Sequence, residues 1–205
     1  MQSDITREEW NRYIFSLYFD SANTPLASCI NRAYRDFNRT LNGFASLAHN
    51  TTITEEVKKY LILAFENLRS IKNQEDFDTW HQEQCLAIQA LYTKNNYHFF
   101  YIGQAQKWIN MTFKYIFAYG ENEIKGYNHL YPFCHVPFDT ILSQALKNHK
   151  PPKLGTSWSR ITDYTKYMEY QIWFRNEFKD SPPLDTEFRL WNKEKKTLSL
   201  LHVKL

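Results

Sequence analysis

Apolar residues recur at three- and four-residue spacing along almost the whole chain. This spacing places apolar side chains on one face of an α-helix, whereas a half-buried strand alternates with a period of two. Only 5 glycines and 7 prolines interrupt the pattern in 205 residues. The pattern therefore predicts an all-α fold.

The first half of the chain carries clear helix-start signals. Thr6 and Glu9 form a capping box ahead of a helix that is expected to run to Tyr18. The apolar face of that helix comprises Trp10, Tyr13, Ile14 and Leu17. Three further helices are expected to begin at Pro25, at Thr54 and directly after Asn73.

The second half predicts further helices with less regular connections. Gly103 and Gly120 bracket an amphipathic stretch from 104 to 119, and Val136-Pro137 introduces another helix. Later helices are expected over 159–178 and 184–193, after a hinge at 150–155. The alternating tail formed by Leu198, Leu200, His202 and Val203 suggests a short strand or an extended docking segment.

Composition limits the class of protein. A hydrophobic content of 43% is enough for the core of one domain over residues 1–205. We divide it into a helical lobe (1–99), a middle segment (100–149) and C-terminal helices (150–205). No run of eighteen apolar residues and no secretory signal layout is present, so we expect a soluble, cytoplasmic monomer without a membrane partner.

Cysteine and histidine spacing does not indicate a metal or a cofactor. Cys29, Cys85 and Cys134 are far apart and form no C-x-x-C pair, so buried free thiols are expected. His129 and His135 lack a third ligand at metal spacing. We therefore expect neither a metal site nor a cofactor.

Lys107 is the first residue that suggests chemistry. It follows Gly103 closely, in what the pattern predicts to be the first turn of a helix. The positive end of the helix dipole disfavours an ammonium there, so Lys107 is a candidate for an uncharged, nucleophilic amine. Taken alone, the motif favours a lysine that extends from an amphipathic face to solvent over a nucleophile.

Asp139 is the second candidate. It follows Val136-Pro137-Phe138 at an expected helix start, where the helix dipole stabilises a carboxylate. An ionised aspartate suits a cationic transition state, although capping of the helix is the commoner use of aspartate at such a position.

Together these segments resemble the helix-hairpin-helix DNA glycosylases. The family motif runs from a hairpin glycine and a catalytic lysine to a V-P-x-D sequence that carries a catalytic aspartate, matching Gly103, Lys107 and Val136–Asp139. The archaeal-type 8-oxoguanine glycosylase branch is the closer match, because a glutamine precedes the lysine and a Pro-Phe pair precedes the aspartate. The resemblance covers roughly residues 100–192.

The resemblance implies a two-lobed helical fold with the active site between the lobes, and a DNA glycosylase with AP-lyase activity. Its substrate would be duplex DNA with a flipped-out modified purine, 8-oxoguanine above all, and the enzyme would work with the nucleoid. Lys107 would attack C1′ and Asp139 would stabilise the cationic sugar. The implied base pocket contains Trp10, Met111, Asp185 and Trp191, and the implied DNA contacts are Gly103, Gln104, Gln106 and Lys114.

The sequence departs from the branch at three places. Met111 stands where an aromatic residue stacks on the base in the family, and Trp191 comes later than the family's stacking tryptophan. The segment around Trp10 implies a shortened N-terminus. These departures affect the identity of the excised base more than the type of reaction.

Two alternatives remain. A catalytically silent relative, such as a sensor of modified DNA in a defence locus, would bind DNA without releasing a base. A helical protein-interaction module would show neither property, and Lys107 and Asp139 would then be coincidental helix starts that need not share a cleft.

The charge is unevenly distributed. Residues 1–99 carry 10 Lys+Arg against 12 Asp+Glu, while residues 100–205 carry 15 against 10. If DNA is the partner, the second half is expected to supply most of the phosphate contacts.

Overall fold

The computed structural model describes residues 4–19, 24–66, 68 and 70–202, with side chains up to Glu194. Within these residues all regular secondary structure is helical, which confirms the all-α prediction. The α-helices are α1 (Arg7–Tyr18), α2 (Pro25–Phe37), α3 (Asn50–Glu66), α4 (Gln74–Lys94), α5 (Ile102–Tyr119), α6 (Thr140–Ala145), α7 (Tyr164–Glu177) and α8 (Pro183–His202). Short 3-10 helices are η1 (Asn38–Thr40), η2 (Phe44–Ser46), η3 (Asn128–Phe133), η4 (Lys147–His149) and η5 (Trp158–Arg160).

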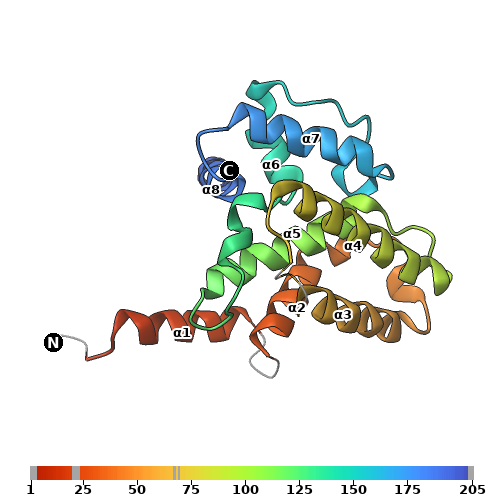
Figure 1. The fold of residues 1–205 in the computed structure, drawn as a ribbon, viewed down its shortest axis with the longest axis horizontal. Helices are drawn as coiled ribbons and strands as arrows, with labels where there is room; N and C mark the ends of the chain where they lie inside the picture. The colour runs from red at the N-terminus through yellow and green to blue at the C-terminus, as the bar shows by residue number, and fades with distance from the viewer. Residues whose placement is uncertain (1–3, 20–23, 67, 69, 203–205) are drawn as a thin grey trace.

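Helix α5 is the centre of the molecule. In Figure 1 it runs through the middle, with α2 and α3 below it and α6, α7 and α8 above it. Trp108, Ile109 and Phe113 on α5 are fully buried, and the Trp108 indole N–H donates to the Ile30 carbonyl on α2 at 3.0 Å. A helix covered on nearly all sides needs apolar residues around its circumference, which explains why α5 is apolar beyond a single stripe.

Side-chain caps fix the starts of several helices. The Thr6–Glu9 capping box at α1 is present, and Asn73 accepts from the Asp76 amide at the start of α4. Thr24 caps α2 just before Pro25, as the sequence indicates. The three cysteines are buried free thiols, as expected.

Several expected boundaries were wrong. Helix α3 begins at Asn50 rather than Thr54, and α7 begins at Tyr164 because residues 158–160 form a separate 3-10 turn. Helix α8 is long, not short, and its backbone continues to His202, so the expected strand or extended tail is helical. The last residue of that expected segment, Val203, lies outside the described residues.

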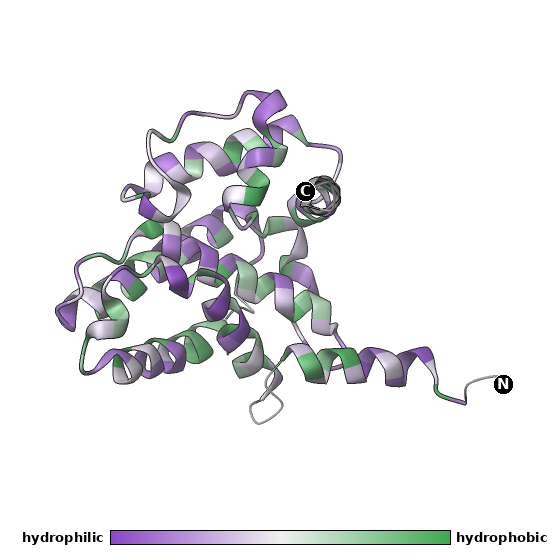
Figure 2. Ribbon diagram, turned by 180° about the vertical axis from the view of Figure 1, so that it is seen from behind, coloured by the Kyte–Doolittle hydropathy of each residue, from purple (hydrophilic) through white to green (hydrophobic). Residues whose placement is uncertain are grey.

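Helix α1 projects from the body of the protein. Its C-terminal end is anchored where Phe15 stacks on Tyr119 of α5, with ring centroids 5.3 Å apart. Figure 2 shows hydrophobic residues on the half of α1 nearer the body, and yet no residue of α1 is buried. Ile14 and Leu17 are 54% and 70% exposed. Among the described residues, no helix combines the length and apolar character needed to cross a membrane.

Candidate active site

A cavity of about 430 Å³ brings together distant parts of the chain. This volume lies in the range of small-molecule sites, roughly 300–1,000 Å³. The lining residues come from the end of α1, from α2 and η1, from α5, from the start of α6 and from α8: Tyr18, Arg32, Arg35, Asp36, Arg39, Lys107, Met111, Lys114, Tyr115, Asp139, Ile141, Glu187, Phe188 and Trp191.

Lys107 and Asp139 meet in this cavity. The Lys107 ammonium donates to Asp139 Oδ2 at 2.6 Å, and the two side chains are only 6% and 16% exposed. Two residues thirty-two positions apart therefore share one cleft. If the chain were only a protein-interaction module, Lys107 and Asp139 would not need to lie close together.

Lys107 lies in the second turn of α5, not in the first. The helix begins at Ile102, which makes Gly103 its second residue rather than a turn glycine before it. The effect of the helix dipole falls off within the first turn, so it acts on Lys107 more weakly than on a first-turn residue. The Asp139 carboxylate is instead the dominant charge beside the amine.

Asp139 caps α6 while it pairs with Lys107. It is the N-cap residue rather than a first-turn residue, and its Oδ1 accepts from the Leu142 amide at 2.9 Å. The two interpretations of this residue, helix cap and partner of the lysine, are therefore both correct. The Oδ2 atom remains directed at the amine.

Charges around Asp139 favour its ionised form. Burial by itself would raise the pKa of this carboxyl, but the Lys107 ammonium, the Leu142 amide and the more distant Lys114 together lower it. Asp139 is therefore a carboxylate at neutral pH.

Gln106 fixes the distance between the two candidate residues. Its side-chain amide donates to the Phe138 carbonyl at 2.9 Å, and its side-chain oxygen accepts from the Phe138 amide at 3.2 Å. Gln106 precedes Lys107 and Phe138 precedes Asp139, so this paired contact aligns the two segments one residue before the ion pair. The buried Gln171 amide holds the Val136 backbone with the same paired contact, and the Asn110 amide donates to the Val136 carbonyl at 3.3 Å.

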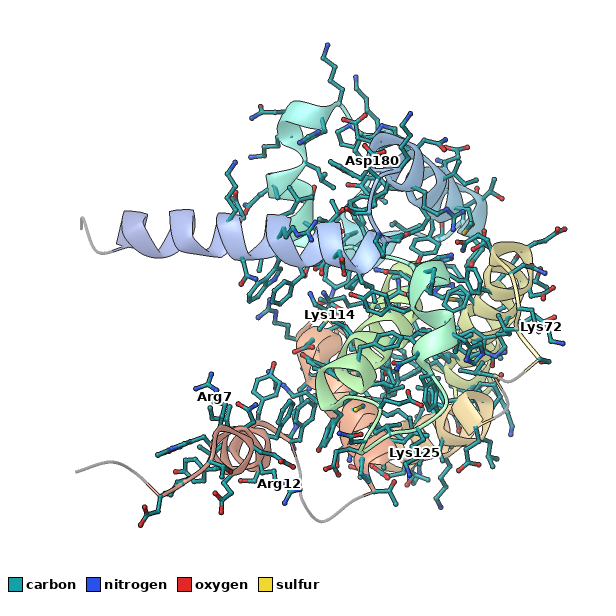
Figure 3. The ribbon with its side chains drawn as sticks, turned by 60° about the vertical axis from the view of Figure 1, so that its left-hand side comes forward. Arg7, Arg12, Lys72, Lys114, Lys125 and Asp180 are labelled. Atoms are coloured by element: carbon teal, nitrogen blue, oxygen red, sulfur yellow. The ribbon has the colours of Figure 1, made fainter. Side chains whose placement is uncertain are left out.

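A second buried ion pair lies on the α8 side of the cavity. Lys114 donates to Glu187 Oε2 at 2.5 Å, and Glu187 is 1% exposed. Burial raises the pKa of Glu187 although Lys114 and Lys107 oppose this. The Lys114 ammonium also lies 5.6 Å from the Trp191 ring centroid. In Figure 3, Lys114 lies on the side of the molecule from which α1 and α8 project.

A third acidic group lies on α2. Tyr115 donates to Asp36 Oδ2 at 2.5 Å, and Arg32 lies 3.5 Å from the same carboxyl. Burial raises the pKa of Asp36, with Tyr115 and Arg32 acting in the opposite direction. Arg32 also donates to the Tyr18 hydroxyl at 2.8 Å.

Sequence reasoning did not identify Glu187 or Asp36. Glu187 precedes Trp191 by four residues and so shares a helix face with it, a signal that could have identified it. Asp36 gave no such signal, because only the packing of α2 against α5 brings it to the cavity.

Three of the residues expected to contact DNA are in the interior. The Gly103 amide donates to the Ile161 carbonyl at 3.1 Å, so it is not free to bind a phosphate. The Gln104 side chain bonds to Thr40, and Gln106 holds Phe138. All three are buried, so the expectation that they contact DNA does not fit this conformation; they connect α5 to its neighbours.

Two of the four expected base-pocket residues lie outside the cavity. Trp10 is 44% exposed on α1 and packs edge-on against Tyr13. Asp185 accepts from the Tyr131 hydroxyl at 2.5 Å, at the base of α8. Met111 and Trp191 do line the cavity, as does Lys114.

No described group of three or more His, Cys, Asp or Glu side chains is arranged to hold a metal ion. No protein-family model, curated protein or solved structure matches this chain. The geometry of the cavity is therefore the basis for assigning a function.

Proposed function

We propose that this protein is a lysine-dependent DNA base-excision glycosylase with AP-lyase activity, whose substrate is a modified purine, 8-oxoguanine above all. The observation that carries the proposal is the 2.6 Å contact between the Lys107 amine and the Asp139 carboxylate inside one cavity of about 430 Å³. An amine beside a carboxylate that can take up its proton suits imine chemistry at a sugar carbon.

The reaction begins with proton transfer. Lys107 must lose a proton before its nitrogen can attack, and Asp139 Oδ2 is the acceptor already in contact. The nitrogen then bonds to C1′ of the everted nucleotide as the C1′–N9 bond breaks. The electron pair of that bond leaves with the base, which takes up the proton from Asp139.

The later steps follow from the new C–N bond. Opening of the sugar ring gives a protonated imine on Lys107, whose positive charge acidifies the C2′ hydrogens. Loss of one of these protons and departure of the 3′-phosphate complete a β-elimination. The carboxylate of Asp139, held at the start of α6, stabilises the positive charge at each stage.

The other wall of the cavity suits a flat base. Met111 and Trp191 offer a thioether and a ring for packing against a purine. The Lys114–Glu187 pair offers a donor and an acceptor for the polar edge of the base. A pocket that hydrogen-bonds a base discriminates against analogues that leave its buried polar groups unpaired.

The proposal includes the helix-hairpin-helix architecture. In this assignment α4, the connection 95–101 and α5 form the motif. The active site would lie between a lobe formed by residues 1–99 and the C-terminal helices. The contributions of α2 and α8 to one cavity support this arrangement. The enzyme would act as a monomer on nucleoid DNA.

One observation favours a second function. The exposed apolar face of α1, with Trp10, Tyr13, Ile14 and Leu17 all at least 44% exposed, fits a surface that binds another protein. Such binding is compatible with a catalytic cavity or with a silent DNA-binding relative.

Covalent trapping tests the proposed function. Duplexes that hold 8-oxoguanine or an abasic site are incubated with the protein and borohydride, which reduces an imine to a stable adduct. We expect an adduct with wild type and none with Lys107→Gln. An adduct that persists in Lys107→Gln would exclude Lys107 as the nucleophile.

Lys114→Gln is the matched control, because it removes the other lysine of the same cavity. We expect it to keep the adduct on the abasic duplex, where no base needs to be recognised. Binding of the abasic duplex by wild type without any adduct would instead establish the silent relative.

A further inference from the structure

We propose that Arg35 and Arg39 form a phosphate clamp at the rim of the cavity, which grips the DNA backbone beside the everted nucleotide. The inference rests on the proposed function, because it assigns the part of α2 and η1 that would hold the substrate strand. From the sequence, most of the phosphate contacts were expected in the second half of the chain.

The two arginines lie at the edge of the candidate active site. Both line the cavity with Lys107 and Asp139, and both side chains are exposed. Arg35 lies on the last turn of α2 and Arg39 lies on η1, which follows directly, so the two side chains reach the same cavity from consecutive elements. Neither side chain forms a hydrogen bond or ion pair with any described residue.

The cavity carries two more positive than negative side chains. Among the described residues, the lining holds five basic and three acidic side chains. Each carboxyl group already has a partner: Asp139 pairs with Lys107, Glu187 with Lys114, and Asp36 with Arg32. Arg35 and Arg39 are the two cations that remain, so a ligand that brings two negative charges would balance the site.

Adjacent phosphates of one DNA strand supply this charge. A guanidinium presents its N–H groups as a planar fork that matches two phosphate oxygens. Cations near a helix C-terminus also interact favourably with the helix dipole, which accounts for arginines at this end of α2. The dipole does not account for their position on the face that lines the cavity.

The salt dependence of DNA binding tests the clamp. Anisotropy titrations use a duplex with a tetrahydrofuran abasic analogue, at salt concentrations from about 50 to 200 mM. Each phosphate neutralised contributes about 0.9 to the slope of log K against log salt. We expect Arg35→Ala/Arg39→Ala to lower the slope by about two and to weaken binding roughly tenfold or more.

Two variants control for charge and for position. Arg35→Lys/Arg39→Lys keeps both charges and is expected to keep the slope. Lys59→Ala/Lys72→Ala removes two exposed charges that do not line the cavity and is expected to behave as wild type. Lys72 lies across the molecule from Lys114 in Figure 3.

The outcomes separate this inference from the proposed function. An unchanged slope in Arg35→Ala/Arg39→Ala, with Lys107 still trapped, overturns the clamp and leaves the glycosylase intact. An equal loss of slope in the Lys59/Lys72 variant also overturns the clamp, because net charge and not position would then explain the effect. Absence of both DNA binding and a trapped adduct in wild type overturns the proposed function, and the clamp with it.

Discussion

The Asp139 carboxylate uses its two oxygens for different contacts. Oδ1 accepts from the Leu142 amide at 2.9 Å and caps α6, while Oδ2 accepts from Lys107 at 2.6 Å. One aspartate can therefore cap a helix and pair with a lysine at the same time. This dual use makes the choice of substitution decisive in any test of its role.

Asp139→Asn separates the two roles. Asparagine is as good an N-cap as aspartate, so we expect the free energy of unfolding to fall by no more than about 1–2 kcal/mol, from the lost charge partner of Lys107. Base release is expected to disappear, because the neutral amide accepts no proton from Lys107 and stabilises no cation. Release from an 8-oxoguanine duplex under single-turnover conditions measures this, with DNA affinity measured in parallel.

Equal turnover by Asp139→Asn and wild type would remove the carboxylate from the mechanism. Asp139→Ala serves as the control for capping, because it loses both roles. We expect it to be less stable than Asp139→Asn by about 1 kcal/mol.

Gln106 shows how a residue can be assigned to the correct region and still make a contact that the sequence did not predict. Its position beside Lys107 identified it as part of the site, and a contact with DNA followed from the family resemblance. The structure gives it two hydrogen bonds to the backbone of Phe138 instead. Sequence spacing cannot reveal such a contact, because the two residues are thirty-two positions apart.

At the scale of the element, α5 is held in place by a close backbone approach at Gly103. A Cβ atom built on Gly103 would lie 1.8 Å from the Trp158 carbonyl oxygen in η5. Gly103 is helical and has no positive φ, so close approach and not turn geometry is what requires glycine here. Trp158 also donates to the Thr140 hydroxyl at 3.1 Å, which connects η5 to the residue after Asp139.

Gly103→Ala distinguishes these two reasons for the glycine. Helix propensity alone favours alanine over glycine by about 1 kcal/mol, so the substitution would stabilise the protein if space were free around residue 103. We expect a loss of about 1–3 kcal/mol instead, because the methyl group must displace the η5 backbone. Chemical denaturation measures the change, and any gain in stability would contradict the close approach.

Helices α1 and α8 show where periodicity was less informative. The face of α1 has helical spacing, and yet its apolar residues remain exposed, because spacing does not say whether a partner element covers them. Proline and alternating residues suggested that α8 was short, but its backbone is helical to His202.

At the scale of the whole molecule, a buried polar network joins α4, α7 and the segment before Asp139. His81 bonds to Tyr164 and Asn110, and His135 bonds to Tyr167 and Asp78. Burial lowers the pKa of both histidines below the ordinary value of 6.5. The neighbouring His135 lowers the pKa of His81 further, whereas the Asp78 carboxylate partly offsets the lowering of the His135 pKa. At neutral pH both imidazoles are therefore neutral in the folded protein.

This network predicts a loss of stability in mild acid. Below pH 6.5 the unfolded chain takes up protons that the folded protein does not, so the free energy of unfolding falls as the pH decreases. Each histidine contributes up to about 1.4 kcal/mol per pH unit. Urea titrations between about pH 7 and pH 5 measure the slope.

The control is exposed His98, whose replacement by glutamine is expected to leave this slope unchanged. His81→Gln is expected to flatten it, whatever its effect on stability at neutral pH. Other titrating groups cancel in the comparison with wild type. A wild-type slope that persists in His81→Gln would exclude His81 as a source of the acid sensitivity.

The sequence by itself determined the helical class and most of the helix starts, whereas Lys107 and Asp139 were paired only through the resemblance to a known family. Periodicity and capping act between residues a few positions apart, so local order is enough to predict the helices. Only the tertiary structure decided which groups share the cavity: it brought in Asp36 and Glu187, left Trp10 outside and placed Arg35 and Arg39 at the rim. The physical reason is that a pocket is formed by packing between distant segments, here α2, α5 and α8, whose relative positions depend on contacts that no local pattern records.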